Sequence, residues 1–341
     1  MPPDNDVFVP DRDSQPKHVR SVDSPPPEGQ DGQFSQSWFP ICTSDEVPPG
    51  STKSFDFLDG RVVVFRNAAG IARVMSAYCP HMGADLACGD VHEDTMRCGF
   101  HHWQFDINGM CVRTGVGDPV PPRARLFSYP CVERWGIVFA FNGLEPLWSL
   151  PDFRYPDADL VVRSFAIDGF MPVDPWMQCA NTPDMQHIKT MHGIKFDAQD
   201  PDDEVSWGEY SMSYFFKGRH RQQQKVENWV AVYGTSLYWQ ETVIDGKWFG
   251  FMVPMGLQRP SRTRNFFVLC AHREMGNAGE INRFIDDMVQ LELSVVGEDV
   301  DVLSRIRFRP GTLTAGDKTL VKFFHYLKRY PRAHPGAGFI S

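Results

Sequence analysis

Two short stretches, CPHMG at residues 79–83 and CGFHHW at residues 98–103, decide how the first half of this chain folds. Each stretch supplies one cysteine and one histidine. Two thiolates and two imidazoles are the ligands of a [2Fe–2S] cluster in which histidines hold one of the irons. Neutral imidazole makes such a cluster easier to reduce than a cluster with four thiolates. The stretches therefore predict an electron-accepting cluster, with these ligands: Cys79, His81, Cys98 and His101.

A zinc site is the main alternative, because two cysteines and two histidines also form a tetrahedral zinc set. Zinc fingers, however, group cysteine with cysteine and histidine with histidine, whereas each stretch here carries one of each. Glycines surround the four residues, at Gly83, Gly89 and Gly99, and permit the tight loops that gripping a binuclear cluster requires. The iron–sulfur cluster is therefore favoured over zinc.

The composition is that of a globular protein, with 341 residues, 42% of them hydrophobic and 23% charged. This length is sufficient for two domains, each with its own core. No apolar run approaches the ~18 residues of a membrane span, and the N-terminus lacks a signal-peptide pattern. The net charge of −9 argues against nucleic-acid binding. Eight cysteines without secretory context favour reduced thiols and a cytoplasmic location.

The chain divides into three parts by composition. Residues 1–36 are rich in proline, aspartate, serine and glutamine, and we expect them to form a disordered extension. Residues 37–150 carry short β-branched and aromatic runs between turn residues, which predict a small all-β domain. Residues 151–341 mix aromatic strands with a helix expected over 281–308 and an amphipathic segment at 317–329. The expected fold class is α+β, with an antiparallel sheet in the second domain.

A second candidate metal site lies in the run NTPDMQHIKTMHG at residues 181–193. His187 and His192 are five residues apart, so on an ideal helix they point about 140° away from each other. They can share a metal only if the turn is π-like, or if the helix ends at His192 with Gly193 as its stop. Two surface histidines would be the simpler interpretation of this run alone. The electron-accepting cluster, however, needs a destination for its electrons.

Two histidines and one carboxylate form an iron site with open coordination positions. A helical wheel places Val296, Val300, Leu303 and Ile306 on one apolar face. A carboxylate in such a face is costly unless it is paired or binds a metal. Asp299 lies inside this face, Glu298 and Asp301 point away from it, and Glu292 lies inside if the helix continues through Gly297. Geometry thus leaves Asp299 and Glu292 as candidates for the third ligand. Six acidic residues were considered: Asp286, Asp287, Glu292, Glu298, Asp299 and Asp301.

Together, the motifs resemble the catalytic subunit of a Rieske non-heme iron oxygenase over about residues 38–330. The iron motif of that family, N-x-x-D-x-x-H-x4-H, is matched by Asn181, Asp184, His187 and His192. Its third ligand is typically the aspartate of an E/Q-D-x-x-(V/I)-(L/W) run. The run at 298–303 fits this pattern, and the resemblance therefore selects Asp299 over Glu292.

Two positions separate the oxygenases from respiratory Rieske proteins, in which an additional cysteine pair bridges the cluster loops. Ala84 and Phe100 stand at those positions, so this bridge cannot form. Two departures from the family pattern are modest. Gly99 replaces a common proline, and His102 stands where glycine or aspartate is frequent.

The resemblance implies an N-terminal Rieske [2Fe–2S] domain and a C-terminal helix-grip catalytic domain of the START/Bet v 1 type. It implies Fe2+ bound by His187, His192 and Asp299, with O2 as co-substrate. Electrons would come from NAD(P)H through a ferredoxin, a separate reductase or both. It also implies a head-to-tail homotrimer in which Asp184 links His187 to His101 of the neighbouring chain. Asp184 and Asn181 are the expected catalytic residues.

The expected reaction is hydroxylation or oxidative demethylation of a small hydrophobic molecule, either aromatic or polycyclic. The chain length resembles the subgroup without a β subunit, which includes monooxygenases, demethylases and steroid-ring hydroxylases. Seven aromatic side chains are candidates for an apolar pocket, although period two should turn half of them away: Trp207, Tyr210, Trp229, Tyr233, Tyr238, Trp239 and Phe251.

Two further functions remain as alternatives. One is an electron carrier or redox sensor whose second domain is non-catalytic, which the intact set of His187, His192 and Asp299 disfavours. The other is a non-enzymatic ligand-binding protein, which would leave the cluster unexplained.

Overall fold

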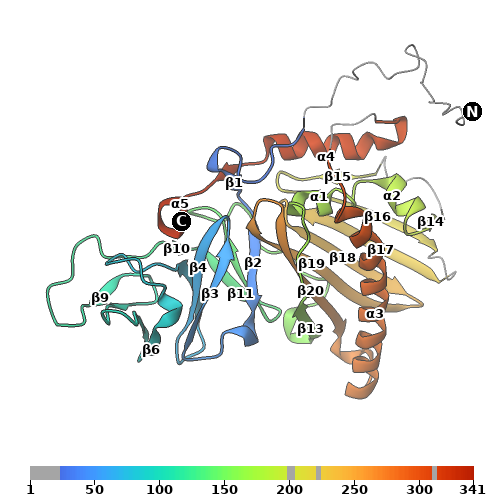
Figure 1. The fold of residues 1–341 in the computed structure, drawn as a ribbon. Helices are drawn as coiled ribbons and strands as arrows, with labels where there is room; N and C mark the ends of the chain where they lie inside the picture. Colours follow the sequence, from blue (N-terminus) through green and yellow to red (C-terminus); the bar gives the residue numbers. More distant parts are fainter. Residues whose placement is uncertain (1–23, 198–203, 220–223, 309–312) are drawn as a thin grey trace, which may run out of the picture.

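The computed structural model describes residues 24–197, 204–219, 224–308 and 313–341. An N-terminal β domain lies beside a C-terminal domain in which one large antiparallel sheet is flanked by helices (Figure 1). The expected α+β class is confirmed. None of the helices in the described ranges is long and apolar enough to cross a membrane.

The N-terminal domain is built from three small antiparallel sheets. The strands of the first are β3 (Ser51–Phe57), β4 (Gly60–Arg66), β5 (Ala72–Ser76) and β10 (Ser128–Tyr129). Those of the second are β2 (Trp38–Thr43), β11 (Cys131–Arg134) and β12 (Ile137–Phe141). Those of the third are β6 (Asp90–His92), β7 (Thr95–Arg97), β8 (Gln104–Phe105) and β9 (Cys111–Arg113).

The third sheet carries the second predicted cluster stretch, because residues 98–103 connect β7 to β8. The turn between β3 and β4 has positive φ at both Leu58 and Asp59, as a two-residue hairpin connection requires.

The C-terminal domain is organised around one antiparallel sheet with seven strands in the order β13-β20-β19-β18-β17-β16-β14, plus β15 paired to β16. Period-two alternation gives each strand one face toward α3 and one toward the N-terminal domain or solvent. The bounds are β13 (Leu160–Ala166), β14 (Lys195–Phe196), β15 (Ser206–Trp207), β16 (Ser211–Arg219), β17 (Lys225–Tyr233), β18 (Leu237–Ile244), β19 (Lys247–Arg259) and β20 (Arg262–His272).

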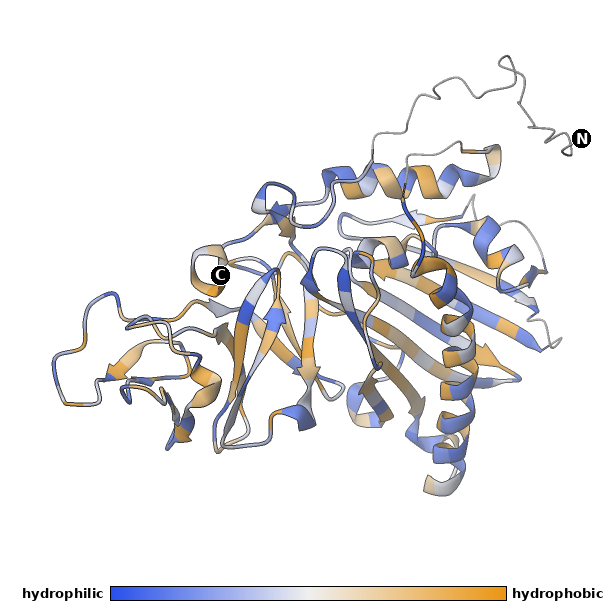
Figure 2. Cartoon of the chain, in the orientation of Figure 1, coloured by the Kyte–Doolittle hydropathy of each residue, from blue (hydrophilic) through white to orange (hydrophobic). Residues whose placement is uncertain are grey.

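Helices cover one face of this sheet. The longest, α3 (Ala278–Leu303), begins with a capping box between Asn277 and Glu280 and runs unbroken through Gly297. Helix α4 (Lys318–Arg329) alternates hydrophilic and hydrophobic bands along its length, as expected for a helix with one buried face (Figure 2). The short helices are α1 (Pro175–Cys179) and α2 (Met185–Thr190), whereas α5 (Ala337–Ile340) packs against β4 of the N-terminal domain.

The helical stretch expected over 281–308 is shorter at its C-terminal end than the sequence suggests. Helix α3 stops at Leu303, so Ile306 does not continue its apolar face, and the Ile306 side chain is 40% exposed. Val296 and Leu303 do face the sheet and pack in the core of the second domain.

The two domains share a buried interface. Strand β19 packs against β2, and at Gly256 a Cβ atom would lie 2.4 Å from the carbonyl oxygen of Pro40. The hydroxyls of Ser37 and Ser236 are 2.7 Å apart across the same interface, and Ser236 also donates to the carbonyl oxygen of Trp38. The domains therefore contact each other closely within the chain.

Part of the predicted extension is ordered, which corrects the expectation for residues 24–36. Strand β1 (Phe34–Ser35) pairs with β21 (Arg332–Ala333), and Phe34 is buried in the N-terminal core. Glu28 is buried as well, and accepts hydrogen bonds from the backbone and hydroxyl of Ser35. These specific contacts offset the low apolar content of the segment. Residues 1–23 lie outside the described ranges, and the boundaries 37–150 and 151–341 stay a proposal.

Candidate functional site

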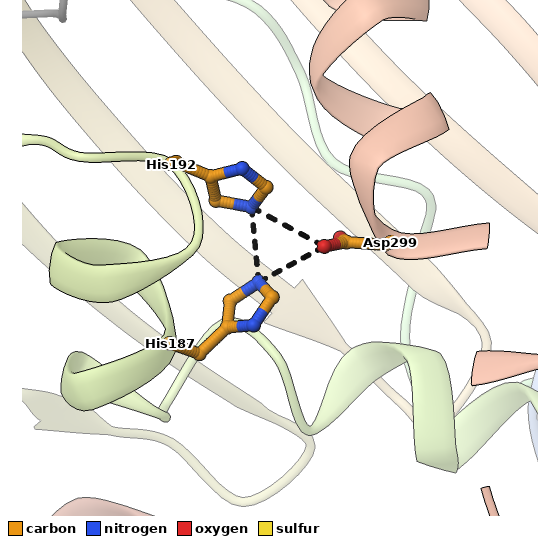
Figure 3. Close-up of side chains that lie close together, drawn as sticks. All are labelled: His187, His192 and Asp299. Carbon is orange, nitrogen blue, oxygen red and sulfur yellow. Dashed lines mark hydrogen bonds and ion pairs between the residues drawn. The ribbon is translucent and has the colours of Figure 1, made fainter. Parts of the chain in front are cut away.

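Three side chains predicted as metal ligands converge on one point, as Figure 3 shows. The Nε2 atoms of His187 and His192 are 2.9 Å apart. The Oδ1 atom of Asp299 lies 3.3 Å from Nε2 of His187 and 3.6 Å from Nε2 of His192. All three donor atoms lie within 4.8 Å of one another. This is the donor set of a two-histidine, one-carboxylate iron site.

The end of helix α2 solves the spacing problem of the two histidines. Asp184 caps the helix, and its Oδ1 atom accepts the backbone N–H of His187 at 2.9 Å. The helix stops at Thr190, and Gly193 adopts a left-handed φ of 63°. His192 therefore lies beyond the helix and turns back toward His187, whereas the second sequence alternative placed the end of the helix two residues later, at His192.

Asp299 has one oxygen held by the protein and one directed at the histidines. Its Oδ2 atom accepts a hydrogen bond of 3.0 Å from Nδ2 of Asn181. Its Oδ1 atom is buried and accepts no hydrogen bond in the described part of the chain. Leaving a buried carboxylate oxygen without a partner is costly. A cation between Oδ1 and the two Nε2 atoms would satisfy it, so these residues fit Fe2+.

Glu298 is a component of the site that the sequence wheel missed. The wheel pointed it away from the apolar face, but its Oε2 atom lies 3.0 Å from Nδ1 of His192. A wheel describes a single helix, whereas His192 approaches from another segment. A carboxylate on Nδ1 fixes the ring orientation and directs Nε2 toward the metal position. The glutamate that precedes the ligand aspartate in the family motif was the available signal.

Glu292, the second carboxylate that geometry left open, lies elsewhere. It is buried, and its Oε1 atom accepts a hydrogen bond of 3.1 Å from Nε2 of Gln240. Glu292 therefore does not join the histidines. Burial raises the pKa of its carboxyl to about 8.

A largely apolar cavity between α3 and the sheet opens onto His187, His192 and Asp299. Of the seven aromatic residues considered from the sequence, Tyr238 and Phe251 line it, and the other five do not. Trp229 and Trp239 belong to the opposite side-chain alternation of their strands, as period two requires. Three further aromatic residues that the sequence analysis did not consider, Tyr214, Phe216 and Phe249, also line it, and aliphatic and some polar side chains complete the walls.

The predicted cluster ligands form a second site in the N-terminal domain. The thiols of Cys79 and Cys98 are buried next to each other, whereas the rings of His81 and His101 lie at the surface with centroids 4.5 Å apart. Paired thiols beneath paired imidazoles fit a binuclear cluster with unlike ends. Burial raises the pKa of the Cys79 thiol to about 12, so binding iron is what would favour its thiolate.

The loops around this site have little room to change. Trp103 stacks on His81 with an interplanar angle of 6°. A Cβ atom at Gly99 would lie 2.4 Å from the carbonyl oxygen of Cys88, and one at Gly89 only 2.0 Å from that of Arg97. Both positions of this chain therefore have no space for a Cβ atom.

Comparison with known proteins identifies the N-terminal domain and the overall fold. Residues 37–130 match the family described as the Rieske [2Fe-2S] domain. Cholesterol 7-desaturase nvd 1 of Ciona intestinalis is 38% identical over 123 residues, which cover 35% of this chain and 26% of that protein. The oxygenase subunit of 5,5'-dehydrodivanillate O-demethylase from Sphingobium sp. (strain NBRC 103272 / SYK-6) is 26% identical over 233 residues, covering 64% of this chain and 54% of the relative.

The fold is also found among solved structures. Dicamba monooxygenase bound to dicamba superposes with a TM-score of 0.68 at 18% identity, over 87% of this chain and 97% of the other. The resemblance to a Rieske oxygenase catalytic subunit is thereby supported at the level of the fold, and the predicted Rieske domain is confirmed by the match over residues 37–130.

Proposed function

Because the chain joins a Rieske domain to the fold of a Rieske oxygenase catalytic subunit, we propose that it uses O2 to hydroxylate or demethylate a hydrophobic small molecule. The main support for this proposal is that His187, His192 and Asp299 converge at the cavity, with one carboxylate oxygen of Asp299 unsatisfied. When bound, the cluster supplies single electrons and Fe2+ supplies the place where O2 is activated.

Three hydrogen-bonding contacts orient the three proposed iron ligands. Glu298 orients His192 through Nδ1, Asn181 orients Asp299 through Oδ2, and Asp184 fixes the start of the helix that carries His187. Each contact restricts one ligand, which keeps the donors converged. The mostly apolar walls of the cavity would hold a hydrophobic substrate next to these three ligands.

The substrate class follows from the cavity and agrees with the relatives. The cavity walls are mostly aliphatic and aromatic, which suits a hydrophobic ring system. The relatives named above include a cholesterol desaturase and an O-demethylase oxygenase subunit. We assign the same broad range, polycyclic or aromatic compounds, to this chain.

The route for electrons is proposed to pass between chains of a head-to-tail homotrimer. Strands β6 and β9, which are next to the cluster loops, lie on the opposite side of the folded molecule from α2 (Figure 1). Around the two surface imidazoles the side chains of Met82, Phe100 and Val116 are 68%, 61% and 86% exposed. An exposed apolar rim of this kind suits docking of a partner protein. We propose two kinds of partner. One is the neighbouring subunit, in which Asp184 would accept a hydrogen bond from His101 of this chain. The other is a ferredoxin or an NAD(P)H-dependent reductase.

An electron carrier with a non-catalytic second domain would explain fewer of the structural features. It would have no use for three converged donors or for an apolar cavity beside them. The oxygenase explains both.

Iron and acid-labile sulfide analysis tests the proposal. The reconstituted chain should contain three irons and two sulfides, and His187→Ala should contain two irons with unchanged sulfide and an unchanged cluster spectrum. His325→Ala, which removes an exposed histidine of α4, should leave all three irons in place. NADH-driven oxygen uptake, measured with a reductase and a panel of ring compounds, should be lost in His187→Ala alone. Two irons in both wild type and His187→Ala would refute the oxygenase.

A further inference from the structure

The cavity contains a polar cluster that the iron site does not use. We call Glu292, Gln240, Thr242 and Asn228 the polar clamp. Nε2 of Gln240 donates to Oε1 of Glu292 at 3.1 Å and to Oγ1 of Thr242 at 2.6 Å. The Thr242 hydroxyl in turn donates to Oδ1 of Asn228 at 2.6 Å, and Tyr238 donates to Gln240. The clamp therefore joins α3 to β17 and β18 through a continuous set of hydrogen bonds.

The clamp is buried but incomplete. Glu292, Gln240 and Asn228 are each only 7% exposed, and all of them line the cavity. No hydrogen bond to Oε2 of Glu292 or from Nδ2 of Asn228 is found within the described residues. Neither atom is among the fully buried side-chain atoms that lack a partner, so both have access to the cavity that their residues line. The two remaining groups, one on each side of the cavity, are free to meet a ligand.

The distance from the clamp to the iron site follows from the helix. Glu292 and Asp299 are seven residues apart on α3, which is about two turns or roughly 10 Å along the axis. Val295 and Val296 line the cavity between them. A ligand that touches both ends must therefore have an apolar body about that long. One substituted benzene ring is too short, whereas a system of several fused rings is long enough.

Charge in the cavity limits the ligand further. Among the described residues that line it, none is lysine or arginine, whereas Glu292 and Asp299 both carry carboxyl groups. A carboxylate ligand would be buried without a counter-ion and next to acidic groups, which is strongly unfavourable. With its pKa raised to about 8, Glu292 is mostly protonated at neutral pH and can donate a hydrogen bond to an uncharged oxygen.

We propose that the polar clamp binds a single uncharged oxygen function, a ketone or hydroxyl, at the far end of an elongated polycyclic substrate whose reacting carbon lies at His187, His192 and Asp299. This inference rests on the proposed function, since it refines the substrate of the same cavity. It excludes aromatic acids as good substrates.

Ligand binding without turnover tests the clamp. Dissociation constants are measured anaerobically on the iron-loaded, unreduced protein for four compounds: 5α-androstan-3-one, the parent hydrocarbon 5α-androstane, 5α-androstane-3β-carboxylic acid and cyclohexanone. Wild type should bind the steroid ketone roughly tenfold or more tightly than the hydrocarbon, because one buried hydrogen bond is made. The acid and cyclohexanone should bind more weakly than the steroid ketone.

Variants distinguish hydrogen bonding by the polar clamp from general hydrophobic packing in the cavity. Glu292→Leu should abolish the preference for ketone over hydrocarbon while hydrocarbon binding is retained, and Glu292→Gln should keep most of the preference. Asn228→Val, flanked by Val226 and Val230 on β17, gives a second test if Glu292→Leu does not fold. Glu241→Gln alters a buried glutamate of β18 that does not line the cavity, and it should bind like wild type.

The outcomes distinguish the two proposals. A full preference for the ketone in folded Glu292→Leu or Asn228→Val, or tight binding of the acid to wild type, overturns the clamp even if the chain turns over substrate. A clamp-dependent preference without any oxygen uptake supports the clamp and counts against the oxygenase.

Discussion

Glutamine in place of Glu292 should make the C-terminal domain more stable, by an amount that grows with pH. In the wild type this carboxyl is buried among apolar walls and accepts a hydrogen bond from Gln240. Glutamine has nearly the same shape and can still accept that bond, but it never ionises. The substitution therefore isolates the cost of carrying a titratable group at this position.

The size of the effect follows from the two pKa values. The carboxyl has a pKa near 4.5 in the unfolded chain and about 8 in the folded one. Below pH 4.5 both states hold the proton, and wild type and variant differ by a constant amount. Between 4.5 and 8 the unfolded chain releases a proton that the folded chain retains, so wild-type stability falls by about 1.4 kcal/mol per pH unit. Above pH 8 the loss levels off.

Between pH 5.5 and 7.5 the gap between variant and wild type should therefore widen by about 2.7 kcal/mol. For a domain of this size, this corresponds to roughly 5–10 °C in the thermal midpoint. Tyr238, a titratable residue influenced by Glu292, has a pKa raised well above its usual value by burial and does not ionise in this range.

Thermal scans of both proteins at pH 5.5, 6.5 and 7.5, at a single scan rate, measure the effect. Infrared difference spectra should in addition show a protonated-carboxyl band at pH 6.5 that is missing from the variant. A midpoint difference that is the same at all three pH values, together with no such band, would show that Glu292 is ionised in the folded protein and would refute the reasoning.

Three further substitutions test other contacts. Glu298→Ala should weaken Fe2+ binding roughly 10–100-fold because His192 loses the partner of Nδ1, and Glu298→Gln should weaken it less; competition with a chelator measures this, and equal affinities would contradict the role of Glu298. Gly99→Ala should lose cluster absorbance and sulfide, since its Cβ would clash with the carbonyl of Cys88, whereas Gly338→Ala, with open space around it, should keep both. Asp174→Ala should destabilise the fold by roughly 2–3 kcal/mol, because its carboxylate accepts the backbone N–H groups of Glu28 and Ser261; a thermal midpoint within a degree of wild type would count against this.

Local patterns predicted much of the molecule. The mixed cysteine and histidine stretches, the strand-rich N-terminal domain and the long helix that carries Asp299 all follow from spacing and periodicity. The need for an interrupted helix near His192 was also predictable, because a spacing of five residues on an ideal helix turns two rings apart, although α2 ends at Thr190 instead of His192. Choosing Asp299 over Glu292 required the family motif, since both carboxylates do face inward from an unbroken helix.

Contacts between distant segments were not predictable in this way. Period two shows which residues of β17 and β18 share a face, but not that Asn228 and Gln240 meet a glutamate of α3. The pairing of Glu298 with His192 joins residues 106 positions apart, and a single-helix wheel cannot include it. Residues 24–36 looked too polar to pack, yet Phe34 and a few specific hydrogen bonds attach them to the body.

The packed interface between the two domains has a consequence for mixed assemblies. If the cluster of a chain cannot swing to its own iron, two inactive chains should rescue each other in the proposed trimer. Co-expressed Cys98→Ser and His187→Ala chains would restore activity at those junctions where an intact cluster faces an intact iron site. Each component is present in half of the chains, so random assembly gives about one quarter of wild-type activity. A flexible joint at Gly256 and Pro40 would instead let each chain work alone, and the same mixture would stay inactive.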